Sequence, residues 1–163
     1  MQKSDRLKIK AVAIGGFDGV HVGHKELLKR LQENGLVVVI DAEHANLTPK
    51  GHREKYINYP LHYFELGDIM QLTPKEFMEM LLDFYPKLEK IVVGYDFKFG
   101  YKRSASAQDI KKYFEKSVVI VDEVKVNNIS VHSRTIRGFL RVGDIAQANE
   151  LLGRRYSIEI GRA

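Results

Sequence analysis

Two histidines three residues apart, His21 and His24, end the glycine-rich segment GGFDGVHVGH, which spans residues 15–24. An apolar run over residues 11–14 precedes it, so the segment lies where a predicted strand gives way to a predicted helix. Side chains at this spacing share one face of the first helical turn, where backbone N–H groups are unpaired and the helix dipole is positive. Imidazoles and N–H groups in this position favour an anion such as a phosphate.

The glycines do not match two common phosphate-binding loops. The segment contains no G-x-x-x-x-G-K-[ST] and no G-x-G-x-x-G followed by a ribose-binding acid. Gly23 removes a side chain between the histidines, which would let a phosphate approach the backbone. The chemistry that fits is attack on the α-phosphorus of a nucleoside triphosphate, where stabilisation of charge on the equatorial oxygens dominates. The alternatives are a helix-capping pair or a metal-binding pair, although no cysteine or second histidine pair completes a zinc site.

The elements that must position these residues alternate along the chain. Strands are expected over residues 8–14, 36–40, 90–93 and 118–121, and helices over 22–33, 74–85, 106–116, 133–141 and 144–152. This alternation predicts an α/β fold: a Rossmann-like open, mostly parallel sheet with helices on both faces, in which ligands bind outside the carboxyl ends of the strands.

Several local signals refine this prediction. Thr73-Pro74-Lys75-Glu76 is a capping box with proline at the first helical position. Gly35 is expected to close the first long helix in the left-handed conformation, and residues 124–129 to pair with 118–121 across a turn. The polar stretch over residues 41–60 is long for a connection, which favours a functional loop.

Length and composition indicate one cytoplasmic domain. The chain has 163 residues, 44% of them apolar and 29% charged, and lacks both a membrane-length apolar run and a charged, apolar leader. The absence of cysteine permits a reducing compartment. Lys and Arg number 26 against 21 Asp and Glu, and the net charge of +5 suits either a phosphate-rich partner or simply a solvated basic surface. Because no basic run reaches five residues, a nucleic-acid-binding arm is not expected.

Three segments together resemble one enzyme family. FDGVHVGH resembles the first motif of the FAD synthetases, the FMN adenylyltransferase modules of bacterial bifunctional riboflavin kinase/FAD synthetases, which belong to the HIGH-type nucleotidyltransferases. VVGYDFKFG, residues 92–100, is similar to the second motif, with Lys98 where arginine is usual. Residues 131–156 resemble the third motif, commonly ISSTRIR, and the helices that end near LLGRPY. The resemblance implies a nucleotidyltransferase-type fold and adenylyl transfer from ATP to FMN, giving FAD and pyrophosphate.

The physics and the resemblance together suggest roles for individual residues. His21 and His24 are expected to hold the triphosphate and stabilise charge as pyrophosphate leaves, and Arg137 to grip phosphate oxygens, with a surface ion pair as its alternative. Ser133 is expected to donate to a phosphate or only to cap its helix. Nucleotide-binding residues are expected at Gly16, Phe17, Asp18, Gly23, Gly94, Asp96 and Ser133. The flavin side is assigned to His44 and Tyr95, with packing as the alternative for Tyr95, Phe97 and Phe99.

The chain departs from the family pattern in the third motif and in the loop that shapes the flavin side in relatives. His132 and Arg134 replace hydroxyl residues, and the loop IDAEHA keeps only His44 of the TFxPHP that relatives often carry. Another phosphate-bearing acceptor, such as phosphopantetheine or nicotinate mononucleotide, is therefore an alternative, as is a nucleotide- or RNA-binding module without turnover. Magnesium is expected to arrive with ATP, and no protein metal ligands are assigned.

The resemblance also divides the chain. Residues 1–156 are expected to form the FMN adenylyltransferase domain, and residues 157–163 to begin the connection to a riboflavin kinase domain. That kinase domain is the expected partner in the full-length protein, because its core does not fit in the remaining residues. A membrane is not expected as a partner.

Overall fold

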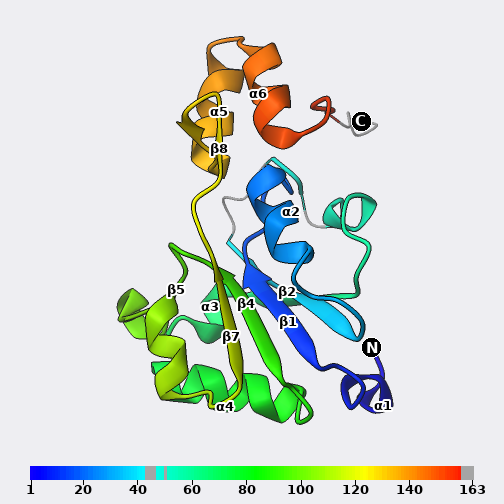
Figure 1. Ribbon diagram of the computed structural model, residues 1–163, viewed down its shortest axis with the longest axis vertical. Coiled ribbons are helices and arrows are strands. Elements are labelled where there is room, and N and C mark those ends of the chain that lie inside the picture. The colour runs from blue at the N-terminus through cyan, green and yellow to red at the C-terminus, as the bar shows by residue number, and fades with distance from the viewer. Residues whose placement is uncertain (43–46, 50, 159–163) are drawn as a thin grey trace.

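The computed structural model describes residues 1–42, 47–49 and 51–158. Within this part of the chain, a five-stranded parallel sheet has the order β3-β2-β1-β4-β7 (Figure 1). Its strands are β1 (Ala11–Gly15), β2 (Gly35–Asp41), β3 (Leu61–Glu65), β4 (Lys90–Gly94) and β7 (Ser117–Val121). The chain leaves β1 toward β2 on one side and reaches β4 on the other, so the carboxyl ends of β1 and β4 flank the point where the strand order reverses.

The rest of the described chain consists of helices and two short ladders. The helices are α1 (Lys3–Arg6), α2 (Val22–Leu28), α3 (Leu66–Ile69), α4 (Pro74–Phe84), α5 (Ser133–Arg141) and α6 (Ile145–Leu152), with 3₁₀ turns η1 (Arg53–Lys55), η2 (Tyr101–Arg103) and η3 (Ala107–Lys112). The ladders pair β5 (Lys98–Phe99) with β6 (Ala105–Ser106), and β8 (Lys125–Val126) with β9 (Ile129–Ser130).

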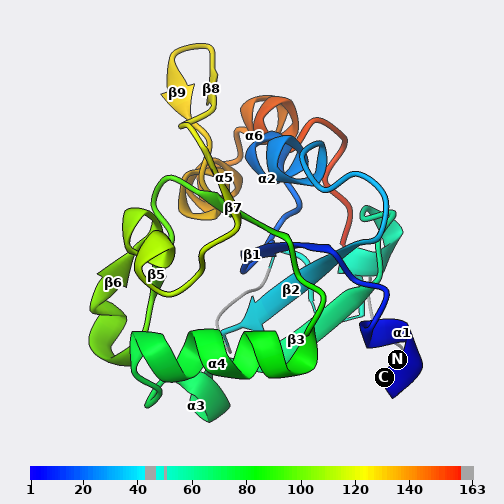
Figure 2. The ribbon, with the colours of Figure 1, turned by 60° about the horizontal axis from the view of Figure 1, so that its bottom comes forward.

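Helices cover both faces of the sheet, as Figure 2 shows for α4 on one face and α2 on the other. Val12, Val38 and Ile91 pack in one core cluster with residues of α4. Their sequence neighbours Ala13, Val37 and Val92 pack in a second cluster with Leu27 of α2. Burial of both faces explains the continuous apolar runs of these strands, and the predicted α/β fold with its open parallel sheet is confirmed.

The helix predicted from the capping box is also confirmed. The Thr73 hydroxyl accepts a hydrogen bond from the Glu76 N–H at 3.1 Å, and the Glu76 carboxylate accepts one from the Thr73 N–H at 3.0 Å. The box therefore fixes where α4 begins.

The predicted end of the first long helix is wrong. Helix α2 ends at Leu28 rather than residue 33, and the left-handed residues beyond it are Gln32 (φ 60°) and Asn34 (φ 58°). Gly35 begins β2, where a Cβ atom would lie 2.9 Å from the Cβ of Leu31. The glycine is thus needed for close packing rather than for a left-handed helix end.

Other predicted elements differ because their signals were local. Residues 124–129 do not pair with β7; β8 and β9 pair with each other, and β7 takes its ladder from β4. The helix expected over residues 106–116 is the shorter η3, although the Ser106–Asp109 capping contacts are present. Strand β3 was not predicted, since LHYFE lies at the sheet edge and is only half-buried.

Candidate active site

A cavity of about 680 Å³ lies at the carboxyl ends of β1 and β4. The loop after β1 and the start of α2 contribute most of the predicted residues: Gly16, Phe17, Asp18, His21, Gly23 and His24. The end of β4 contributes Gly94, the loop after it contributes Tyr95 and Asp96, and α5 contributes Ser133. Arg137 lies outside the lining, and His44 lies outside the described residues. The structure therefore gathers three distant motifs around one space.

His21 and His24 cap each other's backbone. His21 is the N-cap of α2, and its Nδ1 accepts a hydrogen bond from the His24 N–H at 3.2 Å. The Nδ1 of His24 in turn accepts from the His21 N–H, also at 3.2 Å. The two rings stack with centroids 3.5 Å apart and an angle of 11° between their planes. The capping alternative is thus present, alongside the position of both rings in the cavity wall.

Gly23 makes room for this pair. A Cβ atom on Gly23 would lie 3.0 Å from Cε1 and 3.1 Å from Nδ1 of the His21 ring. Any side chain there would press on the imidazole and weaken the reciprocal cap. The glycine is therefore explained by the histidine ring itself, and the close approach of a phosphate remains a prediction.

The caps determine which nitrogen of each ring carries the proton, and burial keeps both rings neutral. Because each Nδ1 accepts a hydrogen bond, the neutral imidazole carries its proton on Nε2. Burial, followed by charge at His132, lowers the pKa of His21 to about 3. Burial, followed by the neighbouring His21 and Arg53, lowers the pKa of His24 well below its usual value. At neutral pH the pair therefore offers two neutral Nε2–H donors rather than two imidazolium charges.

We expect the free energy of unfolding to decrease as pH falls from about 6.5 toward about 3. In that window the unfolded chain binds protons that folded His21 and His24 exclude, at up to about 1.4 kcal/mol per pH unit for each ring. Above about pH 6.5 both states are neutral and this contribution is constant. Urea unfolding across this range checks the slope, and His21→Asn, which keeps a capping oxygen, should flatten it. Equal slopes for the variant and the native chain would contradict the assignment.

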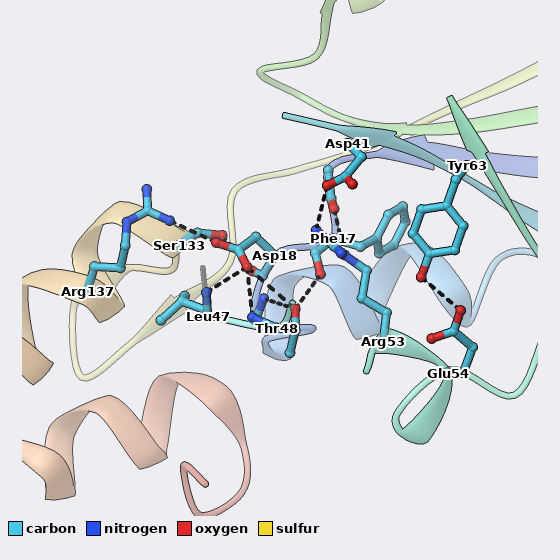
Figure 3. Close-up of polar contacts among 12 residues, drawn as sticks. Phe17, Asp18, Asp41, Leu47, Thr48, Arg53, Glu54, Tyr63, Ser133 and Arg137 are labelled. Atoms are coloured by element: carbon cyan, nitrogen blue, oxygen red, sulfur yellow. Dashed lines mark hydrogen bonds and ion pairs between the residues drawn. The ribbon is translucent and has the colours of Figure 1, made fainter. Parts of the chain in front are cut away.

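Asp18 ties the loop after β1 to two other segments (Figure 3). Its Oδ1 accepts hydrogen bonds from the N–H groups of Leu47 and Thr48, both at 2.9 Å. Its Oδ2 pairs with Nη1 of Arg137 at 2.8 Å, and its carbonyl oxygen accepts from the Ser133 hydroxyl at 2.7 Å. With 7% of its surface exposed, Asp18 connects this loop to residues 47–48 and to α5.

In α5, both Ser133 and Arg137 bind Asp18. Ser133 is the first residue of the helix and the N-cap is His132, whose side chain makes no capping bond, so the prediction that Ser133 caps α5 is wrong. Arg137 forms a part-buried ion pair with Asp18 rather than a surface pair. Its contact with a phosphate remains a prediction.

The loop between β1 and α2 is strained. Phe17 (φ 51°) and Val20 (φ 42°) are fully buried, and both have positive φ, which is an unusual conformation for a β-branched residue such as Val20. Thr48 supports this loop, because its hydroxyl accepts a hydrogen bond from the Gly19 N–H at 2.8 Å. Such strain persists only where surrounding contacts over-determine it.

His132 links the loop after β4 to α5. Its Nε2 lies 3.1 Å from the Tyr95 hydroxyl, and its Nδ1 lies 3.7 Å from Oδ2 of Asp96. Tyr95 is 38% exposed, so its ring remains available on the cavity side. In the sequence, His132 stands out only as a departure from the third motif. That departure does not indicate that His132 lines the cavity.

The rest of the wall combines apolar and basic side chains. Ile69, Met70 and Phe97 line it, together with Lys98 and the η2 residues Lys102 and Arg103. Phe97 and Phe99 also pack in the core, with ring centroids 5.7 Å apart, so the packing alternative is confirmed for these two. Beyond the histidine pair, the cavity thus offers apolar side chains from α3 and cations from β5 and η2.

Comparison with known proteins decides the family. The FAD synthetase family profile matches residues 3–44 and 43–135. A FAD synthetase of Listeria monocytogenes is 30% identical across 90% of this chain and 70% of its own length. The chain belongs to the FAD synthetase family. The bifunctional riboflavin kinase/FMN adenylyltransferase of Buchnera aphidicola is 28% identical over 90% of this chain. The chain spans about half the length of such bifunctional relatives, 55% in this case.

A solved structure agrees on the fold of this family member. A crystal structure described as a macrolide-efflux protein of Streptococcus pneumoniae superposes with a TM-score of 0.77 and 24% identity. The match covers 91% of this chain and 56% of that protein. At this identity the likeness establishes the shared fold alone.

The described part of the chain offers neither a membrane-spanning helix nor a cluster of metal ligands. No helix in residues 1–42, 47–49 and 51–158 combines the length and apolar character needed to cross a bilayer. Over the same ranges, no three or more His, Asp or Glu side chains lie together as a potential metal site.

Proposed function

We propose that this chain transfers the adenylyl group of ATP to FMN, forming FAD and releasing pyrophosphate. In this reaction a phosphate oxygen of FMN bonds to the α-phosphorus, and the bond from that phosphorus to the pyrophosphate oxygen breaks. One observation carries the proposal: in a chain of the FAD synthetase family, all three matched motifs meet at one cavity whose polar wall holds His21 and His24.

The histidine pair suits stabilisation of the leaving group. We assign the two Nε2–H groups to the triphosphate oxygens, where fixed donors need no reorganisation as charge develops. Gly16, Phe17, Asp18 and Gly23 would form the surrounding loop, and Gly94 and Asp96 would meet the ribose or base. Support for the last two comes from their place in the cavity wall directly after β4.

Arg137 and Ser133 receive a modified role in this proposal. Their polar groups already bind the carboxylate and carbonyl oxygens of Asp18. We therefore propose that they hold the loop after β1 in place, and that any contact with a phosphate is additional to this role.

The acceptor is proposed to lie against the apolar side chains of the cavity wall. A planar flavin ring can be buried against Ile69, Met70 and Phe97, whereas its phosphate must reach the histidine pair. Tyr95 is the described candidate for flavin contact, and the proposed contact of His44 lies outside the described residues. A non-flavin acceptor remains the second candidate, because the loop after β2 reads IDAEHA.

Magnesium enters this proposal as part of the substrate complex with ATP. Mg²⁺ usually keeps several waters and binds mainly through substrate phosphates. Such binding does not require a cluster of three protein ligands, and the described residues contain none. We further propose a cytoplasmic reaction, on the basis of the cysteine-free composition, and a riboflavin kinase domain as partner, on the basis of bifunctional relatives. Residues 1–156 would then be the adenylyltransferase domain.

The test supplies Mg²⁺–ATP and one acceptor at a time, either FMN, phosphopantetheine or nicotinate mononucleotide. FMN should give FAD and equimolar pyrophosphate, measured by chromatography and a coupled phosphate assay. Turnover only with another acceptor would replace FMN in the proposal. ATP binding without pyrophosphate would indicate a binding module, and RNA affinity that falls steeply with salt would indicate nucleic-acid binding.

A further inference from the structure

Arg53 is a fully buried cation in the polar stretch between β2 and β3. Its side chain is 0% exposed and extends from η1 beneath the loop after β1 (Figure 3). Its Nε donates a hydrogen bond to the carbonyl oxygen of Gly16 at 3.1 Å. Its Nη2 lies 3.7 Å from Oδ1 of Asp41, the residue that ends β2.

This arrangement is costly if it serves packing alone. Neither Nη1 nor Nη2 of Arg53 has a hydrogen-bond partner among the described residues. Removing a cation from water is costly, and an ion pair at 3.7 Å, with no acceptor for Nη1 or Nη2 among the described residues, recovers only part of this cost. An apolar side chain of similar length would fill the same space without that cost.

A second guanidinium group binds the other half of the same loop. Arg154, which follows α6, donates from Nη1 to the Val20 carbonyl at 3.0 Å and from Nη2 to the Gly19 carbonyl at 2.6 Å. Its guanidinium lies 3.7 Å from the ring centroid of Tyr56, the residue after η1. Two segments far apart in the sequence thus converge on one short loop.

The bonded carbonyl groups adjoin the strained residues. Gly16, bound by Arg53, precedes Phe17 (φ 51°), and Val20 (φ 42°) is itself bound by Arg154. Hydrogen bonds that turn these carbonyl oxygens toward the arginines oppose relaxation of the backbone. His24 follows this loop, and its ring lies 4.9 Å from that of Phe17.

We propose that Arg53 is a positioning residue of the site: through its bond to Gly16 it fixes the loop that precedes the histidine pair. The kinetic part of this inference rests on the proposed function, whereas the supporting effect of the Arg53 charge on His24 does not. Arg53 makes no contribution to the cavity wall, so it acts through the loop and through His24 rather than by touching substrate.

The charge of Arg53 is one of several causes that lower the pKa of His24. Burial is the largest cause of the lowered pKa of His24, followed by His21 on the same helix, Arg53 from η1 and Arg154 after α6. Removal of the Arg53 charge should therefore raise the pKa of His24 only part of the way toward 6.5. A lysine would keep the charge but lose the planar fork that binds Gly16.

The test compares Arg53→Met, Arg53→Lys and the exposed control Arg30→Met. NMR titration should show a raised pKa for His24 in Arg53→Met and an unchanged value in Arg53→Lys. In the FAD-forming assay, kcat of Arg53→Met should fall about ten- to a hundredfold with little change in KM for ATP. The acid limb of its pH profile should move to higher pH, and Arg53→Lys should recover part of kcat and the native limb.

Several outcomes would overturn the inference. Native kcat and native His24 titration in Arg53→Met would show a packing role alone. If that variant does not fold, native kcat in Arg53→Lys would reject the positioning role. If the native chain forms no FAD, the proposed function fails, but the His24 titration still decides whether Arg53 controls the protonation of the site.

Discussion

His24→Asn is expected to reduce the turnover of adenylyl transfer by about a hundred- to a thousandfold, the usual effect of losing one fixed donor to developing negative charge. The reason lies in the two nitrogens of the ring. The Asn oxygen can replace Nδ1 as acceptor for the His21 N–H, so the cap at the start of α2 is retained. The Nε2–H donor has no counterpart. The free energy of unfolding should therefore change by less than about 1 kcal/mol.

His24→Ala is the informative comparison. Both variants lose the donor and the ring stacking with His21, but His24→Ala also loses the reciprocal cap, so it should lose turnover and a further ~1 kcal/mol of stability. Steady-state kinetics and urea unfolding of both variants separate the two effects. Native turnover in a stable His24→Asn chain would mean that His24 serves only to cap the helix.

The burial of the histidine pair decides what removal of either ring costs. An imidazole in the first turn of a helix is ordinarily exposed, and its removal then costs little stability. Here His21 is 6% exposed and His24 packs against it and Phe17. The sequence predicted that the two residues share the first turn of a helix, but their neutral state follows from burial and from caps that only the folded chain reveals.

The sheet was predictable because its strands carry two buried faces. Residues 36–40 and 91–93 are continuous apolar runs, and the capping box at Thr73 fixes the start of α4. The local patterns did not predict β3 or the partner of β7, because both depend on pairing with strands distant in the sequence. β3 lies at the sheet edge without an apolar run, and β7 pairs with β4 although residues 124–129 lie much closer to it in the sequence.

The contacts that support the site were not predictable for a different reason. Arg53 lies in a polar stretch without periodicity, and nothing local distinguishes a buried arginine from a solvated one. Arg154 falls in LLGRRY, which matched the family, yet its bonds to Gly19 and Val20 span more than 130 residues. Such contacts depend on how distant segments meet, which a pattern in one segment does not encode.

Asp18→Asn is expected to lower the free energy of unfolding by about 3 kcal/mol, the range for breaking a buried ion pair. The amide oxygen of the variant can still accept hydrogen bonds from the N–H groups of Leu47 and Thr48. Its NH₂ group would then face Nη1 of Arg137, so that two N–H donors meet without an acceptor. The loop after β1 would lose its tie to α5, so turnover should fall with stability. The exposed control Asp83→Asn should change stability by no more than about 0.5 kcal/mol.

A double-mutant cycle with Arg137→Met isolates the pair. If the ion pair carries the effect, the two substitutions together should cost less than the sum of their separate costs by about 1 kcal/mol or more, because the amide no longer faces the part-buried guanidinium group. Chemical unfolding of the four chains measures this coupling. Additive costs would place the loss in the bonds to Leu47 and Thr48 instead, and would remove the reason for treating Arg137 as a support of the loop that carries His21 and His24.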